Sequence, residues 1–506
     1  MPVRPLSIFK PEPPVLRGVA AYRRYLSFFR DQIGALGKFQ RDFGSIVVLR
    51  ARIPPSMKVR NCIIVSGAEL NRQVLSDVET FQSGGLVIRG PRGSALNRLR
   101  RGLIGSNGEE HREVRRLVSP LFYPAAIKKY LPNMAALIGQ ELNNWPQGET
   151  VDVAERVSRL SLLVSAQNLL AGEKPEKTLP LAEANVELLR QSLHLGVWLC
   201  PLNIFGTPFR RLLKHAEQTE RQLLEMIDNH EPQPEGSSQL LDRLIGYHRE
   251  NPDRLPRENL PGQLFILFSA SHETVATAVT WTLFLLSQHP HILTELYEAI
   301  ENRCGQSQPT FDDLEQLPLL DAIIKETMRL IPPVACVPRR IRAAAEIQGY
   351  EVGPKDFVLL NHYATHRDPE VYVDPQQFRP ERWFTTQPDS FSYLPFGAGP
   401  RTCIGKALGT AAINLLTAMI VQRYRLTLQN GTKIDRSFHV TVAPKYGLPM
   451  HVAKQDGQFQ YIAAQGNIHD MVDLTRPDAT CRPAIAGTVK PAMMTASAAE
   501  SSRRAA

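Results

Sequence analysis

Between Leu260 and Gln288 the chain carries apolar residues on nearly every face of a helix. The run ends at His289-Pro290, where a helix is expected to stop. A helix that is apolar all round must be enclosed by other elements, because no face of it can meet water without cost. The sequence therefore predicts a long helix in the middle of a large core.

A short polar segment, Ala270-Ser-His-Glu273-Thr274, interrupts this helix. Ala270 and Thr274 lie one turn apart on the same face, with Glu273 beside them. An acid and a hydroxyl inside an apolar helix cost free energy unless they are used. One alternative is purely structural: Thr274 could bond back to the carbonyl of Ala270 and Glu273 could pair with a distant arginine.

The rest of the chain favours a helix-rich body with small sheets and no convincing domain boundary. With 506 residues, 43% of them hydrophobic, the chain can form a sizeable core. Two short apolar runs, Ile46–Leu49 and Cys62–Val65, are typical of paired strands. Residues 1–453 are expected to form one domain. Residues 454–506 have little periodicity and are expected to be a largely disordered extension.

Charge and cysteine usage exclude several classes of protein. The net charge of +9 is spread over a long chain, which argues against nucleic acid binding, although a basic face could attract an acidic protein. The six cysteines form no CxxC pair, so neither a disulfide framework nor a zinc site is expected. No signal peptide and no run of about 18 apolar residues is present, which predicts a soluble, cytoplasmic protein without a transmembrane segment.

The second informative stretch is Phe396-Gly-Ala-Gly-Pro-Arg-Thr-Cys403-Ile-Gly405. Gly399 and Gly405 would let the backbone turn sharply and approach a flat ligand. Cys403 precedes an apolar-periodic helix, and a cysteine at a helix N-terminus is biased towards the thiolate that ligates metals. Arg401 could neutralise an anionic group of the same ligand. The plain alternative is a buried cysteine in a glycine-rich turn.

This stretch resembles the haem-binding loop of the cytochrome P-450 family, whose pattern is F-x-x-G-x-R-x-C-x-G. The resemblance implies a mainly α fold with small β-sheets (α+β), with haem between the long central helix and the helix after the cysteine. It implies haem b as cofactor and Cys403 as the axial thiolate ligand of the iron. Phe396, Arg401 and Gly405 would surround the cofactor.

Two further segments occur in the same order along the chain as in the cytochrome P-450 family. Glu326-Thr-Met-Arg329 places its two charges on one face of a predicted helix, and Arg382 follows in a later segment. A lone pair of this kind is usually an exposed salt bridge. The resemblance instead implies a buried triad of Glu326, Arg329 and Arg382 that holds the haem loop in place.

Basic residues at three places could meet the haem propionates. His111 and Arg115 are four residues apart on one predicted helix face, which by itself would suggest a solvated basic patch. Arg339 and Arg340 begin the strand after the Glu326 helix. The resemblance implies that His111, Arg115 and Arg339 bind propionates, with Arg340 a close second to Arg339.

The polar segment of the central helix is similar to the family's A-G-x-[DE]-T oxygen-binding segment, with Ser271 where glycine is usual. The resemblance implies that Glu273 and Thr274, with Ala270 beside them, deliver protons to bound dioxygen. It implies a monooxygenase that inserts one oxygen atom from O2 into a lipophilic substrate. Electrons would come from a ferredoxin or flavodoxin with its NAD(P)H reductase, because the sequence has no motif for a flavin or an iron–sulfur cluster.

The substrate itself stays open. Fatty acid, terpenoid, steroid and polyketide are equally compatible with a pocket of apolar residues. A non-catalytic haem sensor or carrier, or a peroxygenase or isomerase, could use the same fold. The expected pocket residues are Leu86, Val87, Ile88, Leu264, Leu267, Ala270, Val334 and Ala335.

Overall fold

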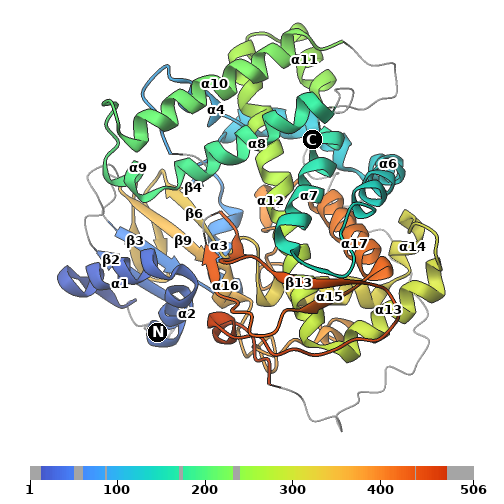
Figure 1. The fold of residues 1–506 in the computed structure, drawn as a ribbon. Coiled ribbons are helices and arrows are strands. Elements are labelled where there is room, and N and C mark those ends of the chain that lie inside the picture. Colours follow the sequence, from blue (N-terminus) through green and yellow to red (C-terminus); the bar gives the residue numbers. More distant parts are fainter. Residues whose placement is uncertain are drawn as a thin grey trace, which may run out of the picture. The chain divides into compact units, whose positions relative to one another are not determined.

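The computed structural model describes residues 13–50, 61–85, 88–169, 175–231, 240–438 and 440–475. Helices make up most of the unit Met1–Asp473, and small sheets complete it, which confirms the predicted fold class (Figure 1). The helices are α1 (Gly18–Arg30), α2 (Gln32–Phe43), α3 (Ala68–Ser76), α4 (Ala95–Leu99), α5 (Gly108–Val118), α6 (Pro124–Leu142), α7 (Val153–Leu169), α8 (Pro175–Ser192), α9 (Leu195–Leu199), α10 (Pro208–Asp228), α11 (Leu240–Glu250), α12 (Leu260–Gln288), α13 (Pro290–Cys304), α14 (Phe311–Glu315), α15 (Pro318–Leu330), α16 (His362–Thr365) and α17 (Lys406–Arg423).

The predicted central helix is α12, with the bounds expected from the sequence. It packs against α7 on one side and against α15 and α17 on another, and Figure 1 shows it running through the middle of the helices. Trp281, Phe265 and Phe284 are among its fully buried side chains. The absence of a polar face explains this position, because every exposed turn would leave apolar surface in water.

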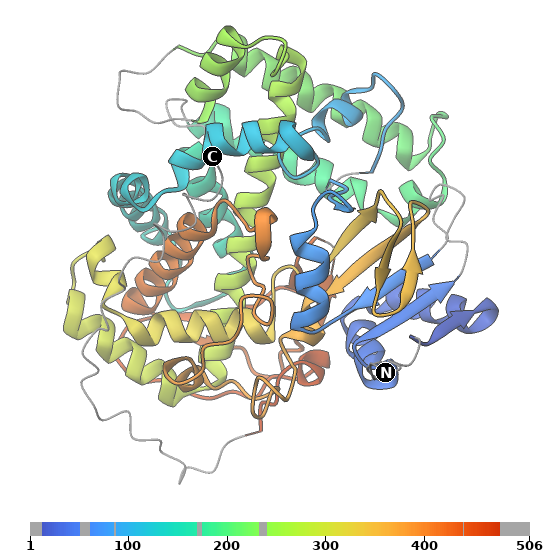
Figure 2. The same ribbon diagram turned by 180° about the vertical axis from the view of Figure 1, so that it is seen from behind.

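A six-stranded sheet lies beside the helices (Figure 2). Its order is β1 (Val15–Arg17), β2 (Ile46–Arg50), β3 (Asn61–Val65), β9 (Asp356–Asn361), β6 (Cys336–Ile341) and β4 (Phe81–Gln82). The predicted pairing of the two apolar runs is confirmed, since β2 and β3 are antiparallel with Val48 opposite Ile63. The remaining strands are β5 (Glu149–Asp152), β7 (Ala345–Ile347), β8 (Tyr350–Val352), β10 (Tyr424–Leu428), β11 (Arg436–Phe438), β12 (Val442–Pro444) and β13 (Pro449–Lys454).

The compact unit continues past residue 453, where the sequence placed its end. Backbone hydrogen bonds join Gln465 to Thr432 and Ile434, and Ile468 and Met471 are fully buried. The unit reaches Asp473. This segment has little periodicity because it is held mainly by backbone bonds to neighbouring loops, and its one regular element is a short 3-10 helix, Asn467–Asp470. The rest of the predicted extension, residues 476–506, lies outside the described residues.

Among the described residues no helix combines the length and apolar character that crossing a membrane requires.

Candidate functional site

A cavity of about 390 Å³ lies between the middle of α12, the N-terminal end of α17 and the loop that precedes α17. Its lining is mostly apolar, and α5, α7 and β6 also contribute to it. Along the whole of α12 only four residues are not buried: Ala270, Ser271, Glu273 and Thr274. All four line this cavity. The polar interruption seen in the sequence is therefore where the central helix borders the open space.

The loop from Phe396 to Gly405 forms the opposite wall. The Cys403 amide donates to the Phe396 carbonyl at 2.8 Å, which closes the loop behind the thiol. Gly399 has a φ of +70°, and a Cβ there would lie 2.8 Å from the Leu75 carbonyl, so glycine is required. Gly405 has a φ of −84°, which any residue can adopt, and a Cβ there would come no closer than 3.9 Å to other protein atoms; its approach to a ligand stays a prediction.

The Cys403 side chain opens onto the cavity. Burial in the protein raises the pKa of the Cys403 thiol, while the Gly405 amide, Arg115 and Lys406 act in the opposite direction. The effect of burial on the pKa of the Cys403 thiol is therefore larger than the opposing effect expected at a helix N-terminus. A metal ion on the sulfur would remove the proton regardless, since a coordinating thiol is deprotonated.

Four basic residues line the same cavity: His111 and Arg115 from α5, Arg339 from β6, and Arg401. Burial, together with Arg401 and Arg115, lowers the pKa of His111 to about 4. Burial and Arg401 lower the pKa of Arg339 to about 10. Burial and Arg115 lower the pKa of Arg401 to about 10. Arg115, Arg339 and Arg401 are thus partly or fully desolvated cations that repel one another, whereas His111 is neutral at pH 7.

Within the described part of the chain, the hydrogen bonds of these guanidinium groups go to neutral oxygens. Arg115 donates to the Thr402 carbonyl at 2.8 Å, and Arg339 donates to the Pro338 carbonyl at 3.1 Å. Arg401 donates to the Ser106 carbonyl and the Asn107 side chain. Arg339 is buried and Arg115 and Arg401 are half-buried, so an anionic ligand in the cavity would be favoured by all three.

The pleat of β6 places Arg339 and Arg340 on different faces of the sheet. Arg339 is buried and lines the cavity, whereas Arg340 is exposed on the other face of the strand. Successive side chains of a strand point to opposite faces, so only one of the two can reach the ligand space.

The predicted triad is present, and it is fully enclosed. Glu326 accepts two bonds from Arg329, both 2.8 Å long, and one from Arg382 Nε at 3.0 Å. The Trp383 indole also donates to Glu326 at 3.0 Å. Burial alone would raise the pKa of Glu326, but Arg329 and Arg382 hold it below its usual value.

The triad is connected to the cysteine loop through one histidine. Arg329 donates to the His366 carbonyl at 2.9 Å, and the Leu394 amide donates to His366 Nε2 at 2.7 Å. Leu394 lines the cavity two residues before Phe396. The ion pair therefore positions the segment that carries the loop and does not contact the cavity itself.

The polar segment of α12 shows the back-bond expected of the structural alternative, and its side chains also line the cavity. Thr274 Oγ1 does bond back to the Ala270 carbonyl, at 2.9 Å, and Ser271 Oγ bonds to the Phe268 carbonyl at 2.8 Å. Glu273 Oε1 accepts a hydrogen bond from Thr441 Oγ1 at 3.1 Å. Thr441, far away in the sequence, was not predicted, and no local signal marks it.

The predicted substrate pocket is only partly right. Leu267, Ala270 and Val334 line the cavity, whereas Leu264 and Ala335 are buried elsewhere and Ile88 is not part of the lining. Leu86 and Val87 lie outside the described residues. The sequence also missed one side of α7, which contributes Ser161, Val164, Ser165 and Leu169.

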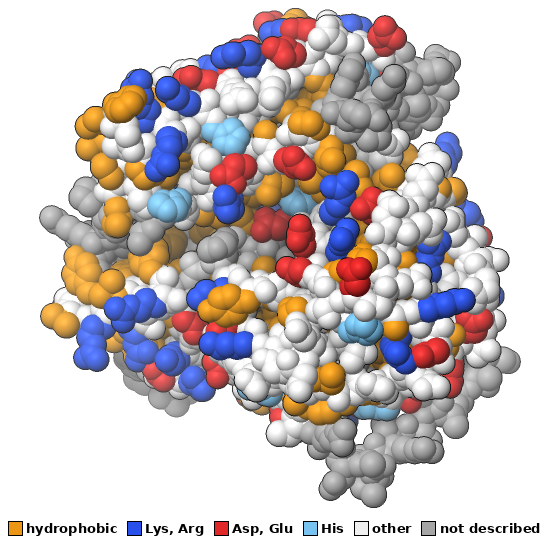
Figure 3. Space-filling model, viewed as in Figure 1, with side chains coloured by type: hydrophobic (Ala, Val, Ile, Leu, Met, Phe, Trp, Pro, Cys, Tyr) orange, Lys and Arg blue, Asp and Glu red, His pale blue; other side chains and the backbone are white. Residues whose placement is uncertain are grey.

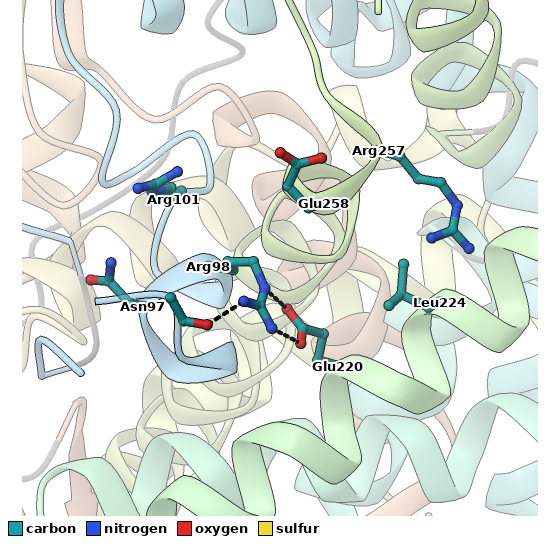
Figure 4. Close-up of a pocket in the computed structure, with 8 residues that line it drawn as sticks. Asn97, Arg98, Arg101, Glu220, Leu224, Arg257 and Glu258 are labelled. Atoms are coloured by element: carbon teal, nitrogen blue, oxygen red, sulfur yellow. Dashed lines mark hydrogen bonds and ion pairs between the residues drawn. The ribbon is translucent and has the colours of Figure 1, made fainter. Parts of the chain in front are cut away.

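A second, polar cavity of about 400 Å³ lies by the arginine-rich segment before α5 (Figure 4). There Arg98 of α4 makes two bonds to Glu220 of α10, with Nε–Oε1 at 2.6 Å and Nη2–Oε2 at 2.5 Å. The Arg98–Glu220 pair connects the arginine-rich segment to α10. Gly102 of this segment packs against α12: a Cβ on Gly102 would lie 2.3 Å from the carbonyl oxygen of Gly262.

A family model described as cytochrome P450 matches residues 27–450. The chain belongs to the cytochrome P450 family. Haem b with a thiolate ligand is therefore the cofactor of this P450.

Known P450s resemble the chain over most of its length. Cyclooctat-9-en-7-ol 5-monooxygenase of Streptomyces melanosporofaciens is 29% identical over 395 residues, covering 76% of this chain and 84% of the relative. The putative cytochrome P450 120 of Synechocystis is 28% identical, and the match covers 87% of this chain and 96% of the relative. The structure of a retinoic acid-bound cyanobacterial CYP120A1 superposes with a TM-score of 0.73 at 26% identity, covering 88% of this chain and all of that one. This P450 is thus an oxidoreductase of a family of monooxygenases.

Proposed function

We propose that this P450 inserts one oxygen atom from O2 into a C–H or C=C bond of a lipophilic isoprenoid. The observation that carries the proposal is the apolar cavity with Cys403 on one wall and the polar turn of α12 on the other. The named substrate of one relative, cyclooctat-9-en-7-ol, and the ligand of the structural neighbour, retinoic acid, are both isoprenoids. Their class fits a cavity whose polar groups are few.

When bound, haem with an axial thiolate supplies the activation of dioxygen. The residues of this chain would hold and orient it. Cys403 would be the axial ligand, and Phe396 and Gly405 would lie against the ring. His111, Arg115, Arg339 and Arg401 would meet the propionates. What supports these roles is that each residue lines the one cavity that contains the thiol and the buried cations.

Glu273 and Thr274 would move protons to the oxygen side of the cavity. Both side chains border the open space, and Ala270 leaves room beside them. Thr274 Oγ1 can donate either to the Ala270 carbonyl or to a ligand in the cavity, so its proton can be redirected without rebuilding the helix. Glu273 keeps a fixed position through Thr441.

Replacing Thr274 by alanine is expected to uncouple the enzyme, lowering product formed per NADPH by about tenfold or more while peroxide rises. The matched control is Thr282→Ala, because Thr282 makes the same back-bond, to the Ala278 carbonyl at 2.8 Å, but is fully buried away from the cavity. Parallel assays of NADPH, peroxide and product would measure the effect. If Thr274→Ala formed as much product per NADPH as the wild type, the Thr274 hydroxyl would not be part of the proton path.

Replacing Arg339 by leucine is expected to weaken haem binding by about tenfold to a hundredfold, the value of one charged hydrogen bond. The apoprotein should become no less stable, because the substitution also removes a buried, repelled cation. Haem titration of the apoprotein and its thermal unfolding would separate the two effects. Arg340→Leu is the control and should retain wild-type affinity. Equal losses in both variants would refute a specific role for Arg339.

The substrate class can be tested by the low-to-high spin shift of the haem on ligand binding. Isoprenoid alcohols and acids should give the shift at lower concentrations than fatty acids of equal carbon number. A preference for straight-chain acids would overturn the isoprenoid assignment while leaving monooxygenation intact. Turnover with a surrogate ferredoxin or flavodoxin and its NAD(P)H reductase tests the proposed electron source. A normal thiolate spectrum without turnover on any substrate would favour a carrier.

A further inference from the structure

The acidic side chain of the central helix has different surroundings from the acids on the surface. Figure 3 shows Asp and Glu side chains on the outside of the protein, several of them beside Lys and Arg side chains, where they meet water. Glu273 is the only acidic residue in the sequence of α12, and it borders the cavity instead. A carboxylate away from bulk water keeps one position only if neighbouring donors hold it there.

Glu273 belongs to a row of side chains that faces a segment far away in the sequence. Glu273, Thr277 and Trp281 follow one another at intervals of four residues, so they lie on one side of α12. Each of them makes a hydrogen bond to residue 441 or 442, at the start of β12. The row therefore joins the segment before β12 to the same helix that carries the acid.

Two hydroxyl groups lie in series behind the Glu273 carboxylate. Thr441 Oγ1 lies 3.1 Å from Glu273 Oε1 and 3.1 Å from Thr277 Oγ1. An ionised carboxylate can only accept hydrogen bonds, so the one proton of the Thr441 hydroxyl is directed at Glu273. Thr277 then donates to the oxygen of Thr441. A hydroxyl that accepts a hydrogen bond is a stronger donor, so Thr277 strengthens the bond to the acid.

The hydroxyl of Thr277 departs from the pattern of the helix. Thr274, Thr280 and Thr282 donate back to the carbonyl four residues earlier, at distances of 2.9, 2.8 and 2.8 Å. Such a back-bond is common for a threonine inside a helix. Thr277 donates across to Thr441 instead. The direction of the Thr277 hydroxyl is therefore set by the neighbouring segment and not by the helix.

The segment that carries Thr441 is itself fixed. The Trp281 indole donates to the Val442 carbonyl at 2.6 Å, and the Val442 amide donates to the Pro333 carbonyl at 3.1 Å. Trp281 and Val442 are fully buried. Thr441 therefore cannot follow the Glu273 carboxylate when it moves, and its hydroxyl defines one position for that carboxylate.

The two hydroxyls end inside the protein. Thr277 is 5% exposed and Thr441 is 2% exposed. A path that carried protons from solvent to Glu273 through these hydroxyls would need an end that is open to water. Glu273 borders the cavity, so its proton is exchanged on that side. The geometry is that of an anchor for the acid and not of a proton channel.

We propose, on the basis of the proton-delivery role proposed above for Glu273, that Thr441 and Thr277 are positioning residues for its carboxylate. Their hydroxyls hold the carboxylate at the cavity, where it can deliver protons. Without the Thr441 hydroxyl the carboxylate loses one charged hydrogen bond and spends less time in this position. More of the dioxygen should then take up two electrons and two protons and leave as hydrogen peroxide, so that less product forms per NADPH.

The test compares two substitutions at Thr441 in the full-length holoprotein. Thr441→Val removes the hydroxyl at nearly the same volume and is expected to lower product per NADPH by about threefold to tenfold, the effect of one charged hydrogen bond. Thr441→Ser keeps the hydroxyl and should keep the wild-type ratio. An equal loss in both variants would assign the effect to the methyl group and overturn the proposal.

Thr277→Val is expected to lower product per NADPH less, by about twofold to threefold, because Thr441 can still donate to the acid. The matched control is Thr280→Val, since Thr280 is also buried on α12 but donates to the Ala276 carbonyl at 2.8 Å. Thr280→Val should keep the wild-type ratio. Equal ratios in the two variants would contradict the role of Thr277. If Thr441→Val does not fold, this pair of variants decides the question.

Glu273→Gln shows separately whether Glu273 delivers protons at all. If Glu273→Gln kept the wild-type ratio of product to NADPH, proton delivery by Glu273 would fail, and the positioning role with it. If Glu273→Gln uncoupled the enzyme and Thr441→Val did not, only the positioning role would fail. We expect both to uncouple, and the double variant to lie within about twofold of Glu273→Gln, because both changes act on one group.

The position of the carboxylate is a readout that does not depend on turnover. A crystal structure of Thr441→Val should show Glu273 in a different position or in several, whereas that of Thr441→Ser should show it as in the wild type. A Glu273 side chain that stays in place in Thr441→Val would overturn the proposal.

Discussion

Replacing Cys403 by alanine is expected to abolish the thiolate signature of the haem and reduce product formation to background. Cys403 is the only cysteine in the lining of the cavity as described, so no other thiolate there could take its place on the iron. Without the thiolate, the electron donation that favours O–O cleavage is lost. The spectrum of the reduced carbonyl adduct reports the ligand directly, and product assays report the consequence.

Cys304→Ala is the control for this experiment. Cys304 is partly exposed at the C-terminal end of α13 and does not line the cavity. It should retain the wild-type spectrum and turnover. If the thiolate spectrum survived in Cys403→Ala, the assignment of the axial ligand would be wrong.

Replacing Glu326 by alanine is expected to destabilise the protein by about 3–5 kcal/mol and to cause loss of haem. The substitution leaves Arg329 and Arg382 as buried cations without their carboxylate. It also removes the acceptor of the Trp383 indole. Because Arg329 reaches the cysteine loop through His366, the loop should lose its fixed position. Thermal unfolding and the haem content of purified protein would measure both effects.

The same helix offers a matched control for Glu326. Asp321 and Lys325 form an ion pair on α15 at 2.6 Å, with side chains 41% and 40% exposed. Asp321→Ala should cost less than about 1 kcal/mol and leave haem content unchanged, because exposed ion pairs contribute little. If Glu326→Ala does not accumulate, Glu326→Gln can be measured instead and should also bind haem more weakly. Glu326→Ala with wild-type stability and haem content would contradict a positioning role for the triad.

Where a prediction rested on a pattern within one element, the structure agrees with it closely. The bounds of α12 follow from its continuous apolar character and from His289-Pro290. The sharp turn at Gly399 and the pairing of β2 with β3 were likewise readable from local residues. Gly405 shows the limit of such reasoning, since a glycine in a motif need not adopt a conformation that only glycine allows.

Predictions that depended on which face of an element meets which neighbour were less complete. The alternation of a strand guarantees that Arg339 and Arg340 diverge, but only the position of β6 between β9 and β4 shows which of them enters the cavity. The partner of Arg98, Glu220, could likewise be found only in the structure, because it lies on a helix more than a hundred residues later.

The sequence by itself determined that this chain encloses a long apolar helix, interrupted once by Ala270 to Thr274, and carries a cysteine loop with the P450 pattern. These features are local, because helix periodicity and turn chemistry act between residues close in the chain. The tertiary structure alone decided that Thr441 holds Glu273, that α7 supplies one wall of the cavity, and that residues 455–473 belong to the compact unit. Such contacts join segments far apart in sequence, and they depend on packing geometry that no local pattern encodes.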